Sequence, residues 1–92
     1  MSQANVTVYG STTCPDTTRA TALLHAKQIP FEFKDVDESP ELNEYLADLN
    51  GGKRVLPTIR INNETLFNPG PDELRRAVDQ ATEVATGATP GA

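Results

Sequence analysis

The order in which apolar residues change their spacing restricts the fold of this 92-residue chain more than any other feature. Alternating apolar residues predict strands over residues 5–9, 29–34, 57–61 and 65–67, and apolar residues spaced three and four apart predict helices over residues 15–28, 40–49 and 72–85. The opening strand, helix and strand imply a parallel pair with a right-handed crossover, and the short link at residues 62–64 implies a hairpin. The sequence therefore predicts an α/β fold in the order βαβαββα, with a central four-stranded mixed sheet flanked by three helices.

Residues with special backbone preferences mark the ends of these segments. Ser39 and Pro40 are a typical N-cap and first helical residue, and Asn50-Gly51-Gly52 tolerates the positive φ that ends a helix. Asn68-Pro69-Gly70-Pro71 separates the last strand from the last helix. Residues 86–92 offer nothing to bury, so we expect one domain over residues 1–85 and a disordered tail over residues 86–92.

The charge and cysteine content exclude several classes of protein. Thirteen acidic and eight basic residues give a net charge of −5, which disfavours nucleic acids and anionic membranes as partners. No apolar run reaches the roughly 20 residues that cross a bilayer, and no secretory leader precedes the first strand. With one cysteine and one histidine we expect no metal site. Protein and small-molecule partners remain, in the reducing cytoplasm that suits a chain without disulfides.

Cys14, the only cysteine, is the main candidate for chemistry. It follows the first strand, and Pro15 as the first helical residue would make it the N-cap of the first helix. Unpaired N–H groups of Asp16 or Thr17 and the helix dipole would then lower the pKa of its thiol. A free cysteine is more often buried and inert, but here the neighbours are polar, Thr13 among them, which favours an exposed thiol.

Two neighbours of Cys14 each allow two interpretations. The carboxylate of Asp16 either raises the pKa of the thiol or simply stabilises the first helical turn. The hydroxyl of Thr17 either donates to the sulfur or bonds within the helix start. His25 lies eleven residues beyond Cys14, a rise of about 16 Å along a continuous helix, so a Cys–His catalytic pair is excluded.

Three sequence motifs follow one another along the chain. They are Val6-Thr7-Val8-Tyr9-Gly10-Ser11-Thr12-Thr13-Cys14-Pro15, then Asn50-Gly51-Gly52-Lys53-Arg54-Val55-Leu56-Pro57-Thr58, then Thr65-Leu66-Phe67-Asn68-Pro69 with Asp72-Glu73. In this order they resemble the glutaredoxin-type members of the thioredoxin fold, and most closely the actinobacterial mycoredoxins. The resemblance covers most of the chain, from about residue 6 to residue 78.

The resemblance implies a thiol–disulfide oxidoreductase in which Cys14 is the catalytic residue. Its substrates would be S-thiolated proteins, with mycothiol or glutathione as co-substrate and no tightly bound cofactor. Thr17 stands where dithiol members of the family carry a second cysteine, so an internal disulfide cannot form. This departure leaves a monothiol mechanism, and we expect the protein to act as a monomer.

The resemblance also implies which residues bind the small thiol or the substrate. Pro57 is matched to a proline that is cis and faces the cysteine in this fold, with the backbone of Leu56 available to pair with a substrate; the alternative is a trans proline that opens a strand. The remaining candidates are polar residues of the second and third motifs, which otherwise are solvated charges, a turn and a helix cap: Lys53, Arg54, Asn68, Gly70 and Asp72.

Two further functions fit a chain of this kind. An iron–sulfur scaffold would hold a cluster between two copies with one cysteine from each, but such monothiol glutaredoxins typically show Cys-Gly-Phe-Ser, and Pro15, Asp16 and Thr17 differ from that motif at every position. A redox-inactive interaction module would keep the fold and lose the chemistry. A thiol pKa at or above about 8.5 would favour that last function.

Overall fold

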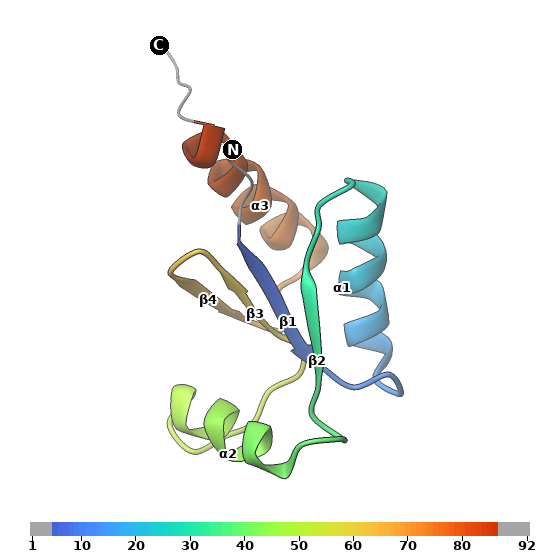
Figure 1. Ribbon diagram of the computed structural model, residues 1–92, viewed down its shortest axis with the longest axis vertical. Helices are drawn as coiled ribbons and strands as arrows, with labels where there is room; N and C mark the ends of the chain where they lie inside the picture. The colour runs from blue at the N-terminus through green and yellow to red at the C-terminus, as the bar shows by residue number, and fades with distance from the viewer. Residues whose placement is uncertain (1–4, 87–92) are drawn as a thin grey trace.

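The computed structural model describes residues 5–86, and its strands form one four-stranded sheet in the order β2-β1-β3-β4 (Figure 1). β1 runs parallel to β2 and antiparallel to β3, and β3 runs antiparallel to β4. The predicted mixed sheet with three helices is therefore confirmed. The elements, in chain order, are β1 (Val6–Gly10), α1 (Pro15–Ala26), β2 (Glu32–Asp35), α2 (Pro40–Leu49), β3 (Thr58–Ile61), β4 (Glu64–Phe67) and α3 (Pro71–Thr86).

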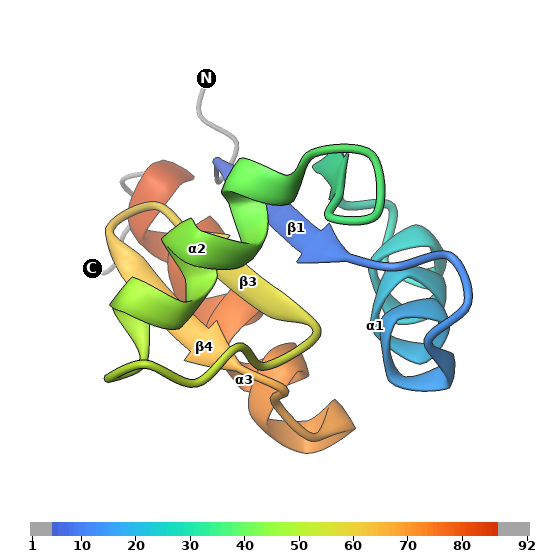
Figure 2. The ribbon, with the colours of Figure 1, turned by 90° about the horizontal axis from the view of Figure 1, so that it is seen from below.

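Alternation along β1 sends its side chains into two separate cores. Val6 and Val8 pack with the apolar faces of α1 and α3, where Leu24 and Val78 have no exposed surface. Tyr9 points to the other face and packs against α2 through Leu46. Figure 2 shows the result, with α2 on one side of the sheet and α1 and α3 on the other.

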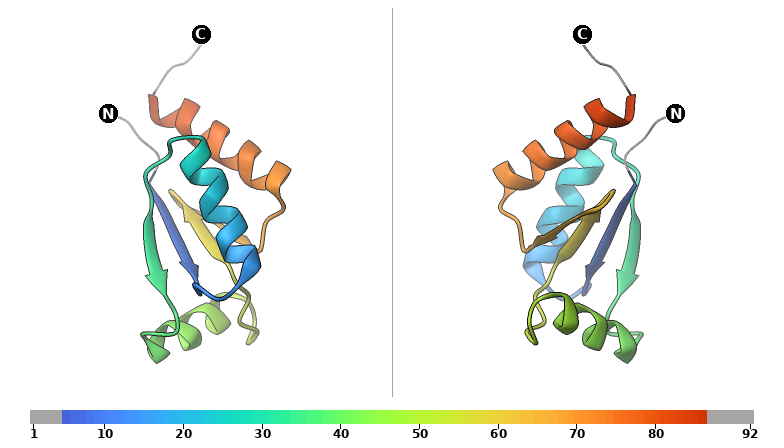
Figure 3. Two further views of the ribbon diagram at one scale, coloured as in Figure 1. Left: turned by 90° about the vertical axis from the view of Figure 1, so that its right-hand side faces the viewer. Right: turned by 90° about the vertical axis from the view of Figure 1, so that its left-hand side faces the viewer.

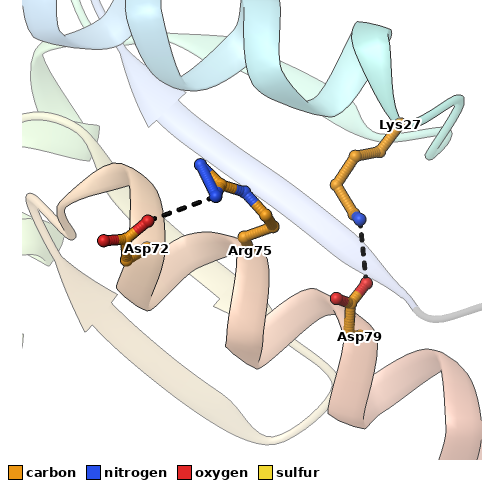
Figure 4. Close-up of polar contacts among 4 residues, drawn as sticks. All are labelled: Lys27, Asp72, Arg75 and Asp79. Carbon is orange, nitrogen blue, oxygen red and sulfur yellow. Dashed lines mark hydrogen bonds and ion pairs between the residues drawn. The ribbon is translucent and has the colours of Figure 1, made fainter.

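The main core carries most of the burial, and an ion pair joins its two helices. Lys27 at the end of α1 contacts Asp79 of α3 at 2.9 Å (Figure 4). Both side chains are partly exposed, so we expect this pair to contribute less than about 1 kcal/mol. The packing of α1 and α3 on one face of the sheet, visible in Figure 3, therefore comes from apolar burial.

The start of β2 differs from the sequence prediction. We predicted a strand over residues 29–34, but β2 begins at Glu32, and α1 ends at Ala26 rather than near Gln28. Gln28 has a left-handed backbone (φ 59°), and the N–H of Ile29 donates to the Leu24 carbonyl as part of the helix end. The chain uses these residues to leave α1, so Ile29 packs on the main core without joining the sheet.

The other segment ends lie close to their predicted positions. Pro40 starts α2, and Gly51 and Gly52 have the positive φ that its end requires. Thr86 is the last residue of α3, and the rest of the expected tail, residues 87–92, lies outside the described residues. Within residues 5–86, no helix is both long and apolar enough to cross a bilayer.

Candidate active site

The register of the sheet brings the three sequence motifs to one end of the molecule. Tyr9 pairs with Thr58, and Thr58 pairs with Phe67. Because both pairs are antiparallel, the loop after β1, the loop before β3 and the loop after β4 lie at the same end of the sheet. The N–H of Asn68 donates to the Pro57 carbonyl at 2.8 Å, which ties two of the loops together. The Leu56–Pro57 peptide bond is cis, which confirms the expectation drawn from the resemblance.

Cys14 is the N-cap of α1, as predicted. Its backbone is extended (φ −92°, ψ 118°), and Pro15 is the first helical residue. The Cys14 carbonyl accepts the N–H of Thr18 at 3.1 Å. The Cys14 N–H donates to the Ser11 carbonyl at 3.1 Å, so the loop before the helix closes as a turn. The side chain is half-buried, which leaves the thiol accessible from solvent.

The pKa of the Cys14 thiol is lowered, mainly by the backbone N–H of Thr17 and next by the Thr17 hydroxyl. Partial burial opposes this effect, and the N–H of Asp16 supports it. The sulfur forms no closed N-cap hydrogen bond, so these groups favour the thiolate as oriented dipoles at the helix start. The Asp16 carboxylate raises the pKa but is the smallest of the five influences, and Arg19 pairs with it at 3.1 Å. The donors of the helix start therefore outweigh the acidic neighbour.

Thr17 has a second role, because its side chain is only 2% exposed and fills the space behind the cysteine. Its Oγ1 accepts the N–H of Ser11 at 3.4 Å, which leaves the hydroxyl hydrogen free to point at the Cys14 sulfur. It also lies directly on Gly10, where an added Cβ would stand 2.5 Å from the Thr17 Cγ2 atom. Packing and polarity both depend on a small branched hydroxyl residue at this position.

Replacing Asp16 by asparagine should lower the pKa of Cys14 further, because it removes the carboxylate that opposes the thiolate and keeps the backbone N–H. The measurement is the rate of alkylation by iodoacetamide as a function of pH. Asp48→Asn, which removes one acidic charge from the exposed surface of α2, should leave the profile unchanged. A Cys14 pKa that rises in Asp16→Asn would show that the residue acts on the helix start and not through its charge.

The second motif contributes fewer free groups than expected. Arg54 donates to the Asn43 Oδ1 atom at 2.6 Å, and Asn43 donates to the Val36 carbonyl, so this arginine holds its loop on α2. Lys53 is exposed. Leu56 packs its side chain against the α2 core, and among residues 5–86 nothing pairs with its backbone. Of the predicted binding residues in this motif, Lys53 and the Leu56 backbone therefore remain available to a ligand.

A pocket of about 240 Å³ lies between α1 and the start of α3. It includes Asn68 and Gly70 from the predicted set, whereas Asp72 lies outside it and pairs with Arg75 of its own helix at 3.1 Å (Figure 4). Asp16 of α1 was also predicted as a site residue. The other helix residues of the pocket were not predicted, because apolar residues spaced three and four apart indicate only a core face. The complete lining is Asp16, Arg19, Ala20, Leu23, Asn68, Pro69, Gly70, Pro71 and Leu74.

Comparisons with known proteins agree with this geometry. A sequence model of the Glutaredoxin family matches residues 6–66. A protein described as a glutaredoxin in Mycobacterium tuberculosis is 30% identical over 76 residues, which cover 82% of this chain and 90% of that protein. Mycoredoxin 1 of Corynebacterium glutamicum is 31% identical over 62 residues, 67% of this chain and 76% of that protein. The solution structure of a glutaredoxin from Brucella melitensis superimposes with a TM-score of 0.66 at 30% identity and covers 87% of this chain and 84% of that chain.

These matches confirm the resemblance stated from the motifs, and the structural match confirms the thioredoxin fold. The family match covers the Cys14 loop, the cis-proline loop and all of the sheet except Phe67, the last residue of β4. The chain therefore belongs to the glutaredoxin family, whose members are generally thiol–disulfide oxidoreductases.

Proposed function

We propose that this protein reduces mixed disulfides between proteins and a low-molecular-weight thiol, and that it does so with Cys14 alone. The observation that carries the proposal is a half-buried thiol of lowered pKa at a helix N-cap, in a chain with no second cysteine. A thiolate attacks a disulfide fastest when the pKa of its thiol lies near the ambient pH. A moderate lowering of the pKa therefore suits exchange better than an extreme one.

The cycle consists of two exchange steps. The Cys14 thiolate attacks the small-thiol sulfur of the mixed disulfide, that S–S bond breaks, and the protein substrate leaves as a thiolate that takes up a proton. Cys14 is then joined to the small thiol. A second small-thiol molecule, as thiolate, attacks this adduct and leaves as the oxidised small disulfide, which restores Cys14. The small thiol taken from the substrate and the second small-thiol molecule thus leave together as one disulfide, and an external reductase reduces that disulfide with two electrons from NADPH.

The groups around Cys14 divide between the two parts of the substrate. Lys53 supplies a cation for a carboxylate, and the free backbone of Leu56 beside cis-Pro57 can pair with an extended chain. Asn68 and Gly70 offer polar and backbone groups at the start of α3. Arg54 and Asp72 were also predicted to bind; their side chains are paired within the protein, so we assign them supporting roles.

Mycothiol is our preferred co-substrate and glutathione the alternative. The preference rests on the Asn-Gly-Gly, Arg-x-x-Pro-Thr and Asn-Pro motifs and on the relative that is named a mycoredoxin. We further propose that the protein works as a monomer in the cytoplasm and that residues 1–85 carry the activity. The lowered pKa of Cys14 argues against a redox-inactive module, and the Asp16 carboxylate beside the sulfur disfavours an anionic iron–sulfur cluster.

The test compares two coupled assays on one protein substrate. One contains the mycothiolated substrate, mycothiol and mycothiol reductase, and the other contains the glutathionylated substrate, glutathione and glutathione reductase. We expect NADPH oxidation to be faster in the mycothiol assay and intact mass to show one mycothiol on Cys14. Faster turnover with glutathione would reverse the assignment of the small thiol, and no turnover in either assay would overturn the proposed function. Anaerobic reconstitution with iron and sulfide, expected to give no visible absorption bands, separates the scaffold function.

A further inference from the structure

Ser11 is the centre of a hydrogen-bond network that the proposed chemistry does not explain. Its side chain is 5% exposed, although serine side chains are mostly found at the surface. Its Oγ lies 3.0 Å from the Thr13 Oγ1 atom and accepts the Thr13 N–H at 3.3 Å. Its carbonyl accepts the Cys14 N–H, and its own N–H donates to Thr17. One residue thus contacts three residues of the catalytic loop and helix start.

The network continues to a different loop of the protein. The Ser11 hydroxyl donates to the Asp37 Oδ2 atom at 2.5 Å, across 26 residues of sequence. Among residues 5–86, Ser11 is the one partner of the Asp37 carboxylate, and the Asp37 N–H is held by Asp35. A hydrogen bond to a charged acceptor is roughly twice as strong as a neutral one. The turn between β2 and α2 is therefore hydrogen-bonded to the loop that carries Cys14.

We propose that Ser11 and Asp37 are positioning residues that hold the Cys14 loop in its reactive geometry. The thiolate is favoured by groups whose effect depends on their direction, namely the Thr17 N–H, the Thr17 hydroxyl and the Asp16 N–H. These donors lie in the first turn of α1, and the loop from Ser11 to Cys14 sets the backbone of Cys14, and with it the sulfur, relative to them. If the hold of Asp37 on Ser11 is lost, the loop can move and the donors no longer point at the sulfur.

The sign of the effect separates positioning from simple charge. Asp37 is an acid, so as a charge alone it would raise the pKa of a nearby thiol, and its removal would lower that pKa. As a positioning residue it acts in the opposite direction, because its removal loosens the donors and raises the pKa. Asparagine at this position keeps an oxygen that accepts the Ser11 hydroxyl and removes the charge. The two explanations therefore predict opposite results for Asp37→Ala. For Asp37→Asn, positioning predicts the wild-type pKa, whereas charge alone predicts a lowered Cys14 pKa.

The experiment measures iodoacetamide alkylation of the full chain against pH for Asp37→Ala, Asp37→Asn, Ser11→Ala and the Ser11→Ala/Asp37→Ala double variant. We expect Asp37→Ala and Ser11→Ala to react about threefold more slowly at pH 7, because a raised Cys14 pKa leaves a smaller fraction of thiolate. Asp37→Asn should react like wild type. The double variant should be no slower than either single variant, because both break the same contact. Glu38→Ala serves as the matched control. It removes the acidic side chain next to Asp37, which forms no hydrogen bond to Ser11.

Asp37 is exposed, so its variants are expected to fold even if Ser11→Ala does not. Faster or unchanged alkylation of Asp37→Ala would overturn the inference, as would equal slowing by Glu38→Ala. A lower melting temperature with an unchanged pH profile would also overturn it, since that result describes a purely structural contact. The relevance to catalysis rests on the proposed function, but the alkylation profile needs no substrate. Failure of the coupled assays in wild type would therefore overturn the proposed function, and the alkylation profiles would still decide this inference.

Discussion

The Cys14→Ser protein should show no turnover of a thiolated substrate and a melting temperature equal to or above that of wild type. Turnover requires a thiolate, and a serine hydroxyl stays protonated and does not exchange with disulfides. The chain has no other cysteine that could replace Cys14. Loss of activity should therefore be complete and not partial.

The stability expectation follows from the position of Cys14 at the N-cap. The thiol closes no N-cap hydrogen bond, whereas serine is among the preferred N-cap residues and contributes about 0.5–2 kcal/mol over a residue that does not cap. The comparison also depends on pH. Because folding lowers the pKa of Cys14, the wild-type thiolate adds stability that is fully present above about pH 8.5 and is lost as the pH falls through the folded value. The advantage of the serine variant should thus shrink as the pH rises.

Thermal unfolding at several pH values and the coupled mycothiol assay check this prediction together. If the Cys14→Ser protein unfolds at a much lower temperature, its loss of activity could not be assigned to the missing thiol. Residual turnover by a well-folded Cys14→Ser protein would contradict the role of the thiolate. The Asp16→Asn variant, which keeps the thiol, is the positive control for the assay.

Gly10→Ala should destabilise the protein by about 1–3 kcal/mol, the usual cost of forcing an extra methyl group into a filled site. The added Cβ would lie 2.5 Å from Cγ2 and 2.6 Å from Oγ1 of Thr17, whose side chain is buried and whose Oγ1 accepts the Ser11 N–H. Gly10 also accepts the Val36 N–H at 3.0 Å at the end of β1, so the backbone cannot shift freely. We expect the strain to pass to the catalytic loop directly after it and to slow alkylation of Cys14.

A double-mutant cycle identifies the cause. Thr17→Ala removes both clashing atoms, so Gly10→Ala should cost less in that background, with a coupling of about 1–3 kcal/mol. Urea unfolding of the four proteins measures it. Gly70→Ala, where an added Cβ meets nothing within 4 Å, is the control for a glycine in a loop and should change stability little. Additive effects of the two substitutions would contradict the proposed contact.

Local patterns were sufficient for most of the fold. Val6 and Val8 alternate along β1, and Ser39-Pro40 and Gly51-Gly52 mark the ends of α2, so short-range physics alone identifies these elements. The start of β2 was predicted wrongly because Ile29 alternates correctly in sequence while its backbone is used to end α1. Alternation reports which side chains are buried, and it does not report which backbone groups pair.

The candidate site divides in the same way. Cys14, its N-cap position and the donors from Thr17 and Asp16 lie within four residues, so the sequence was enough to predict them. The weight of Asp16 against those donors was open, because it depends on the direction of dipoles and on the pair that Arg19 forms with it. The distances and directions of these groups from the Cys14 sulfur decide which effect on its pKa is larger, and the sequence does not give them.

The sequence by itself determined the single thiol, its place before a helix and the order of strands and helices that carries it, because each depends on contacts within a few residues. The tertiary structure alone decided what surrounds that thiol. The grip of Asp37 on Ser11, the contact of Thr17 with Gly10 and the pocket between α1 and α3 join residues that are up to 58 positions apart in the chain. Such contacts follow from how the sheet and helices pack, and packing depends on the whole core at once.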